Sequence, residues 1–177
     1  MQLLLPLDIA GRLASELRRA GHREIGGLLM GEHVEGEVFR IVDISVQRQG
    51  GNSVCFVRRP KDHAAALDDF FQRTERDYVR FNYLGEWHSH PSFHATPSGQ
   101  DLRAMQEIAE DPAVGVNFVV LLIVRNRSRS AMEASATAFR AGASPTVVKL
   151  KTEGAAGAIV APSKRSLVAQ VRRLLGL

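Results

Sequence analysis

The sequence has 177 residues, of which 45% are hydrophobic, and 23 Lys and Arg against 19 Asp and Glu give a net charge of +4. This length fits one domain with its own core, and the composition excludes a disordered tail, a collagen-like fibre and a disulfide-stapled miniprotein. The single cysteine, Cys55, allows no disulfide within the chain, which is typical of a reducing cytosol. The apolar start is too short for a signal peptide, and the run over 116–124 is too short for a membrane helix of roughly 20 residues. We therefore expect a soluble, cytoplasmic protein without a membrane partner.

The first elements are predicted from apolar spacing. Residues 2–5 predict a short edge strand. Apolar residues at helical spacing predict a helix over 8–20, with Asp8 as its N-cap and Gly21 as its end. The next expected strands cover residues 24–31, 38–46 and 52–57. The adjacent Gly26 and Gly27 weaken the first of these strands and indicate the close approach of another backbone or of a ligand.

The rest of the chain alternates helices and strands. An amphipathic helix is expected over 60–81, and the nearly continuous apolar run over 116–124 predicts a central strand buried on both faces. The remaining expectations are a strand at 82–90 ended by Pro91, a helix at 98–110, a strand at 131–140 and a helix at 163–175. Residues 141–162 are expected to form loops around a weak strand at 146–151. This mixture predicts one α/β domain over 1–177, in which 141–177 is a C-terminal extension whose role the sequence leaves open.

Arginines gather at 125–129 and at 172–173. A solvated loop and a helix end explain these clusters better than a nucleic-acid surface does, because no aromatic residues interleave with the arginines. We expect no nucleic-acid partner.

The segment that carries chemistry contains His88, His90 and Asp101. Two histidines two residues apart on a strand point to the same face, so their imidazoles can meet one metal ion. The loop over 91–97 is long enough to bring Asp101 back toward them. Two imidazoles and one carboxylate match the ligand count of a catalytic zinc site, whose fourth position is left to water.

Two further residues could complete a hydrolytic site. Glu24 stands before the glycine pair, and its carboxylate could reach the water as a general base if its strand lies beside His88 and His90. Ser98 could donate its hydroxyl to a developing oxyanion. Each feature also has a simpler explanation, since Ser98 and Asp101 form a helix capping box and a lone His-x-His is more often surface or core. The combination carries the prediction.

That combination resembles the JAMM (MPN-plus, JAB-domain) metalloprotease motif. Glu24 is followed by the glycine pair, and seven residues separate His90 from Ser98-x-x-Asp101. The resemblance covers about residues 2–140 and implies a cytidine-deaminase-like three-layer α/β/α sandwich with a mixed sheet. It also implies one Zn²⁺ per chain held by His88, His90 and Asp101, with Glu24 as the base.

The family acts on the C-terminal tail of ubiquitin or a ubiquitin-like protein, so the resemblance implies such a protein or its conjugate as substrate. The helix at 98–110 leads almost directly into the strand at 116, leaving no room for the second zinc site of some eukaryotic members. The short chain resembles the prokaryotic branch, some of which belongs to operons with activating-like and conjugating-like enzymes, antiphage systems included. The alternatives are a peptidase that trims ubiquitin-like sulfur carriers, a non-catalytic scaffold of the same fold and a DNA-repair-associated relative.

Other residues near the motif are assigned more weakly. Glu86 shares the strand face of the two histidines and is expected either to orient an imidazole or to lie at the pocket rim. Trp87 faces the other way, into the core. His94 is expected to be a solvated loop histidine, and His63 a surface residue. A nucleobase deaminase is excluded, because its ligand set needs a pair of cysteines.

Overall fold

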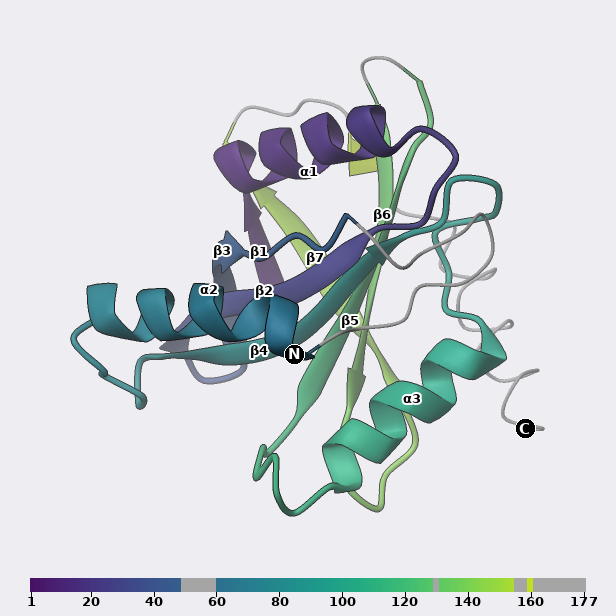
Figure 1. Ribbon diagram of the computed structural model, residues 1–177. Coiled ribbons are helices and arrows are strands. Elements are labelled where there is room, and N and C mark those ends of the chain that lie inside the picture. Colours follow the sequence, from purple (N-terminus) through teal and green to yellow (C-terminus); the bar gives the residue numbers. More distant parts are fainter. Residues whose placement is uncertain (49–59, 129–130, 155–158, 161–177) are drawn as a thin grey trace.

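The computed structural model describes residues 1–48, 60–128, 131–154 and 159–160 (Figure 1). Within these ranges the helices are α1 (Leu7–Ala20), α2 (Pro60–Arg73) and α3 (Gly99–Glu110). The strands are β1 (Gln2–Pro6), β2 (Gly26–Glu35), β3 (Val38–Ile44), β4 (Phe81–Ser89), β5 (Val119–Asn126), β6 (Met132–Phe139), β7 (Thr146–Glu153) and β8 (Ile159–Val160). The strand expected at 52–57, the helix expected at 163–175 and Cys55 lie outside the described residues.

The strands form a mixed sheet that closes on itself. Their order is β5-β4-β2-β3-β1-β7-β6, and β6 pairs in turn with β5, while β8 adds to β6. β1 is parallel to both of its neighbours and β4 is parallel to β5, whereas the other pairs within the ring are antiparallel. The predicted α/β class with a mixed sheet is confirmed. The sequence analysis predicted a sandwich and did not predict that pairing of β6 with β5 would close the sheet.

The position of β1 corrects the sequence prediction. β1 lies between β3 and β7 rather than at an edge. Its consecutive leucines Leu3, Leu4 and Leu5 are all buried, which only a strand covered on both faces allows. β7 is likewise an internal strand, since it pairs with both β1 and β6.

Helices cover both faces of the sheet (Figure 1). The alternating residues of β5 belong to two separate clusters of buried side chains. Val120, Leu122 and Val124 pack in the cluster that contains the apolar face of α1. Leu121 and Ile123 pack with α3 on the opposite face. The prediction that this strand is buried on both faces is therefore confirmed, and α3 is held directly against the strand next to β4.

Two helix boundaries differ from the sequence prediction. The N-cap of α1 is Pro6, without a side-chain hydrogen bond, and Asp8 lies in the first turn, where its charge favours the helix dipole. α2 ends at Arg73 rather than near residue 81, because Glu75 and Arg76 adopt positive φ angles of 55° and 57° and reverse the chain. Gly21 ends α1 as expected. Among the described residues, no helix has the length and apolarity to cross a membrane.

Gly27 and His63 both lie close to Ser45, beside β2. A Cβ on Gly27 would lie 2.0 Å from the Ser45 carbonyl oxygen, so the glycine permits the close approach of a backbone, one of the two predicted alternatives. His63 is buried, with its Nδ1 2.7 Å from the Ser45 hydroxyl oxygen. The prediction that His63 is a surface residue was wrong, because α2 packs its first turns against this side of the sheet.

Candidate active site

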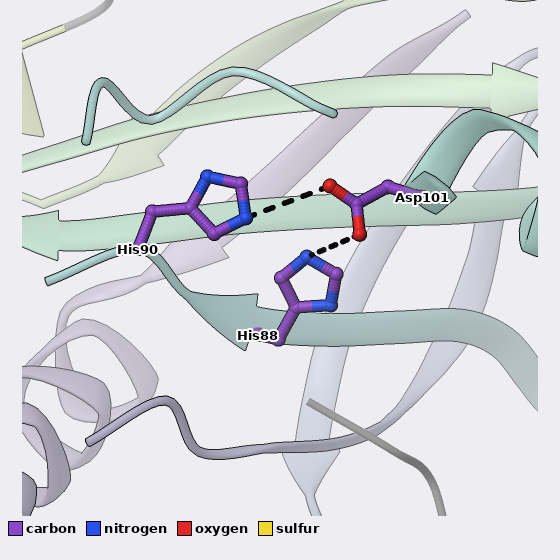
Figure 2. Close-up of side chains that lie close together, drawn as sticks. All are labelled: His88, His90 and Asp101. Carbon is purple, nitrogen blue, oxygen red and sulfur yellow. Dashed lines mark ion pairs between the residues drawn. The ribbon is translucent and has the colours of Figure 1, made fainter. Parts of the chain in front are cut away.

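His88, His90 and Asp101 meet at the junction of β4 and α3. His88 lies near the end of β4, His90 follows that strand directly, and Asp101 lies in the first turn of α3 (Figure 2). The Nε2 atoms of His88 and His90 lie 3.3 Å and 3.5 Å from the two carboxylate oxygens of Asp101. One ligand atom from each residue lies within 4.8 Å of the others. The structure thus brings together the three residues that the sequence predicted as metal ligands.

Their spacing suits a tetrahedral ion. Ligand atoms about 2.0 Å from the centre of a tetrahedron lie about 3.3 Å from one another, and zinc–nitrogen and zinc–carboxylate bonds have about this length. The distance from His88 Nε2 to Asp101 Oδ1 is 3.3 Å. Two imidazoles and one carboxylate are also donors that zinc prefers. The donor set therefore fits a single Zn²⁺.

The capping box of α3 and the candidate ligand are one arrangement. The Asp101 amide donates to the Ser98 hydroxyl oxygen at 3.2 Å, and the Ser98 amide donates to Asp101 Oδ2 at 2.6 Å. The second bond orients the carboxylate that faces the histidines. The helix cap and the grouping of the candidate metal ligands, which the sequence left as compatible interpretations, occur together.

Glu24 is held beside this group by hydrogen bonds between its neighbour Ile25 and Ser89. The Ile25 amide donates to the Ser89 hydroxyl at 3.0 Å, and the Ser89 amide donates to the Ile25 carbonyl at 2.8 Å. β2 then continues antiparallel to β4, with Gly26 opposite His88. Glu24 is only 5% exposed. The strand adjacency on which the role of Glu24 depended is confirmed.

The charges in this group shift one another's pKa values. Burial raises the pKa of Glu24, and the nearby His90 and His88 oppose this shift only in part. Burial alone would raise the pKa of Asp101, but hydrogen bonds with His88 and His90 hold it far below its usual range. For His90, burial would lower the pKa, and the hydrogen bond and charge of Asp101 outweigh burial and raise it. Shifts of this kind gather at functional sites.

All six predicted site residues line one cleft of about 980 Å³. These residues are Glu24, Glu86, His88, His90, Ser98 and Asp101. Glu86 pairs with Leu121 and His88 with Ile123, so the Glu86 side chain shares the face of His88. Trp87 is fully buried on the other face, as predicted. A role for Glu86 in orienting an imidazole stays a prediction.

Three contributions to the site were missed by the sequence analysis. Ser89 fixes Ile25, the His94 carbonyl accepts a hydrogen bond from His90 Nδ1 at 3.3 Å, and Arg125 contacts the loop over 91–97. The side chain of His94 is exposed, as predicted, but its backbone carbonyl contacts a candidate metal ligand. Arg125 was assigned to a solvated cluster, although its side chain is only 23% exposed and ion-paired with Glu133. Their opposite positions on β5 and β6 become visible only once the strands are in register.

A comparison with protein families identifies the family of the chain. The model of the prokaryotic homologues of the JAB domain matches residues 6–140. The chain belongs to this family. The matched segment contains every candidate site residue.

Curated proteins and a solved structure agree with this assignment. A CD-NTase/cGAS isopeptidase of Enterobacter hormaechei is 29% identical over 76% of this chain and 73% of its own length. The 26S proteasome non-ATPase regulatory subunit 14 of Dictyostelium discoideum is 25% identical over 85% of this chain, which spans only 47% of that subunit. A solution structure of a Desulfitobacterium hafniense protein superposes with a TM-score of 0.64 at 18% identity, covering 86% of this chain and 93% of that one. This last likeness concerns the fold alone.

Proposed function

We propose that the protein is a zinc-dependent isopeptidase or peptidase that cleaves after the C-terminal tail of a ubiquitin-like protein. The observation that carries this proposal is the buried carboxyl of Glu24 in the same cleft as His88, His90 and Asp101. Membership in the JAB family and the isopeptidase named among its relatives support the choice of reaction.

The two histidines and Asp101 would hold one Zn²⁺ per chain. When bound, zinc supplies a Lewis acid that polarises the scissile carbonyl and increases the acidity of water. Hydrogen bonds within the chain orient the residues that would bind the metal. The Ser98 amide fixes the Asp101 carboxylate, and the His94 carbonyl accepts a hydrogen bond from His90 Nδ1–H, which leaves the lone pair of Nε2 for the metal ion.

Glu24 would act as the proton carrier. A carboxyl whose pKa is raised by burial accepts a proton more readily than an exposed one, and it can release that proton to a departing amine. Glu24 would therefore take a proton from the attacking water and deliver it to the nitrogen of the leaving group. The Ser98 hydroxyl oxygen accepts from the Asp101 amide, so its own proton is free to stabilise the developing oxyanion.

The names of the relatives support the proposed substrate class. Those named CD-NTase/cGAS isopeptidase favour a bond between a protein tail and an amine on another protein, and we place this chain in a bacterial ubiquitin-like conjugation system with an antiphage role. Activating-like and conjugating-like enzymes would then be its partners. Trimming of a sulfur carrier would use the same residues on a linear peptide.

Metal content is the first test. Elemental mass spectrometry of the purified protein should give close to one zinc per chain. The His88→Ala/His90→Ala double variant, checked for folding by its circular dichroism spectrum, should hold none. A wild type that takes up no zinc after reconstitution would contradict the proposal and favour a non-catalytic scaffold.

Cleavage then distinguishes the substrates. Ubiquitin-like proteins encoded near this chain would be joined to a reporter either through a lysine side chain or through a linear peptide bond. Faster release from the lysine-linked reporter supports deconjugation. Release from the linear fusion alone would instead assign the chain to maturation of a carrier, and release from neither would reject the activity on these substrates.

A further inference from the structure

Arg125 lies at the end of β5 and contacts the loop that covers the candidate site. Its Nη1 donates to the Phe93 carbonyl at 2.9 Å. The same guanidinium donates through Nε to the Glu133 carboxylate at 2.6 Å. One side chain therefore links the sheet to the loop over 91–97.

Glu133 holds Arg125 from behind. The two residues lie directly opposite each other on β5 and β6, and the Glu133 side chain is only 7% exposed. A guanidinium is a rigid fork that can donate in two directions at once, and a lysine ammonium lacks this geometry. Because β5 and β6 are paired along their whole length, this anchor is fixed by the sheet and not by the loop.

The loop connects the Arg125 contact to His90. The residue after Phe93 is His94, whose carbonyl accepts the hydrogen bond from His90 Nδ1 at 3.3 Å. A carbonyl can only accept, so Nδ1 carries a proton, and a metal ion would take the lone pair of Nε2 on the side of Asp101. A shift of the His94 carbonyl would turn the imidazole away from the other two ligands.

The two halves of the loop are anchored differently. Ala95 is fully buried and packs with the buried side chains of α3, whereas Phe93 is 54% exposed. The hydrogen bond from the Phe93 amide to the His90 carbonyl is long at 3.4 Å. Apolar burial therefore holds the second half of the loop, and the first half depends on Arg125.

We propose that Arg125 is a positioning residue, which holds the Phe93 carbonyl so that the adjacent His94 carbonyl orients His90 toward the metal. This rests on the proposed function only in so far as the group held is zinc. Arg125 acts through the loop and need not touch the substrate.

The test compares Arg125→Ala and Arg125→Lys with Arg127→Ala, which removes the same charge from an exposed position two residues along. Zinc affinity is measured by competition with a chromophoric chelator. Loss of an outer partner of a metal ligand weakens affinity on the order of 10-fold, so we expect about this loss for Arg125→Ala. Arg125→Lys should recover part of it, and Arg127→Ala should match the wild type.

Hydrogen exchange supplies a readout that does not depend on metal. In the metal-free protein, the Phe93 and Thr96 amides, which donate within this loop, should exchange faster in Arg125→Ala while the β5 amides remain protected. Unchanged exchange of the loop amides in Arg125→Ala would overturn the proposal. It would also be overturned if Arg125→Ala had a lower Tm but the zinc affinity of the wild type. If the wild type itself binds no zinc, the proposed function fails, and the exchange measurement alone then decides the role of Arg125.

Discussion

Ile25 and Ser89 exchange two hydrogen bonds, one through the Ser89 hydroxyl at 3.0 Å and one through its amide at 2.8 Å. Ser89 lies between His88 and His90, so its side chain and backbone both serve to join β2 to the strand that carries the histidines. Glu24 is the next residue before Ile25. The placement of the candidate base relative to the candidate ligands is therefore set by the hydrogen bonds between its neighbour Ile25 and Ser89.

Replacing Glu24 with Gln tests the proton carrier with little change of shape. We expect kcat/KM to fall by about 10²–10⁴-fold, the usual contribution of a general base. Zinc content should stay the same, because Glu24 is not one of the three grouped donors. Burial already disfavours the charged form of Glu24, so the neutral amide should not lower the Tm. Full activity of Glu24→Gln on a cleaved substrate would exclude this role.

Ser98 has one observed and one proposed role, which suitable variants can separate. Its oxygen caps α3, and we propose that its proton stabilises the developing oxyanion. Ser98→Ala should lower the free energy of unfolding by about 1 kcal/mol and also reduce kcat. Ser98→Gly keeps most of the N-cap stability without any side-chain donor, so its stability should be close to that of the wild type while kcat stays low. Ser98→Thr keeps both functions and is the matched control; equal kcat in the Gly and Thr variants would remove the hydroxyl from the mechanism.

Gly85 is required by the closeness of two paired strands. A Cβ at this position would lie 2.0 Å from the Val120 carbonyl oxygen, and its φ is +143°. Both strands are fixed by pairing, so Gly85→Ala should lower the free energy of unfolding by about 3 kcal/mol or more. Urea unfolding gives this value.

Two other glycines calibrate that result. Gly142 also has a positive φ, of +67°, but a Cβ there meets nothing within 4 Å, so Gly142→Ala isolates backbone strain of about 1–2 kcal/mol. Gly11 is helical with open space around it, and Gly11→Ala should stabilise by about 0.5–1 kcal/mol. A loss at Gly85 no larger than that at Gly142 would contradict the steric explanation.

We expect the ion pairs of Glu32 to make the free energy of unfolding depend on pH. It is ion-paired with Arg40 and Arg80, each with an N–O distance of 2.6 Å. Burial would raise the pKa of Glu32, but the hydrogen bonds from both arginines outweigh it and lower the pKa in the folded protein. The stabilisation is thus fully present above the ordinary glutamate pKa of about 4.3 and is lost as pH falls through the lower, folded-state value.

The Glu32→Gln variant should therefore show a flatter decline of Tm below about pH 5 than the wild type does. The exposed Glu35 provides the control, since Glu35→Gln should leave the profile unchanged. Thermal unfolding followed by circular dichroism at several pH values measures all three proteins. Parallel profiles for the wild type and Glu32→Gln would show that the ion pairs contribute nothing to the acid dependence.

The sequence determined the local features of this protein. Strand alternation puts His88 and Glu86 on one face and Trp87 on the other, and helix-start chemistry puts Ser98 and Asp101 in one turn. These relations depend on residues close together in the chain, so periodicity and capping rules predict them. The apolar run of β5 likewise predicts burial on both faces, because this pattern too lies within one short segment.

Only the tertiary structure decided which segments became neighbours. β1 is central because β7 returns beside it, α2 ends where Glu75 and Arg76 reverse the chain, and Arg125 meets both Glu133 and Phe93. Strand order, ring closure and cross-strand pairs are set by contacts between distant residues, each weighed against the entropy of closing the intervening loops. Local periodicity does not predict these partners. The contact of Arg125 with the Phe93 carbonyl in the 91–97 loop is one example.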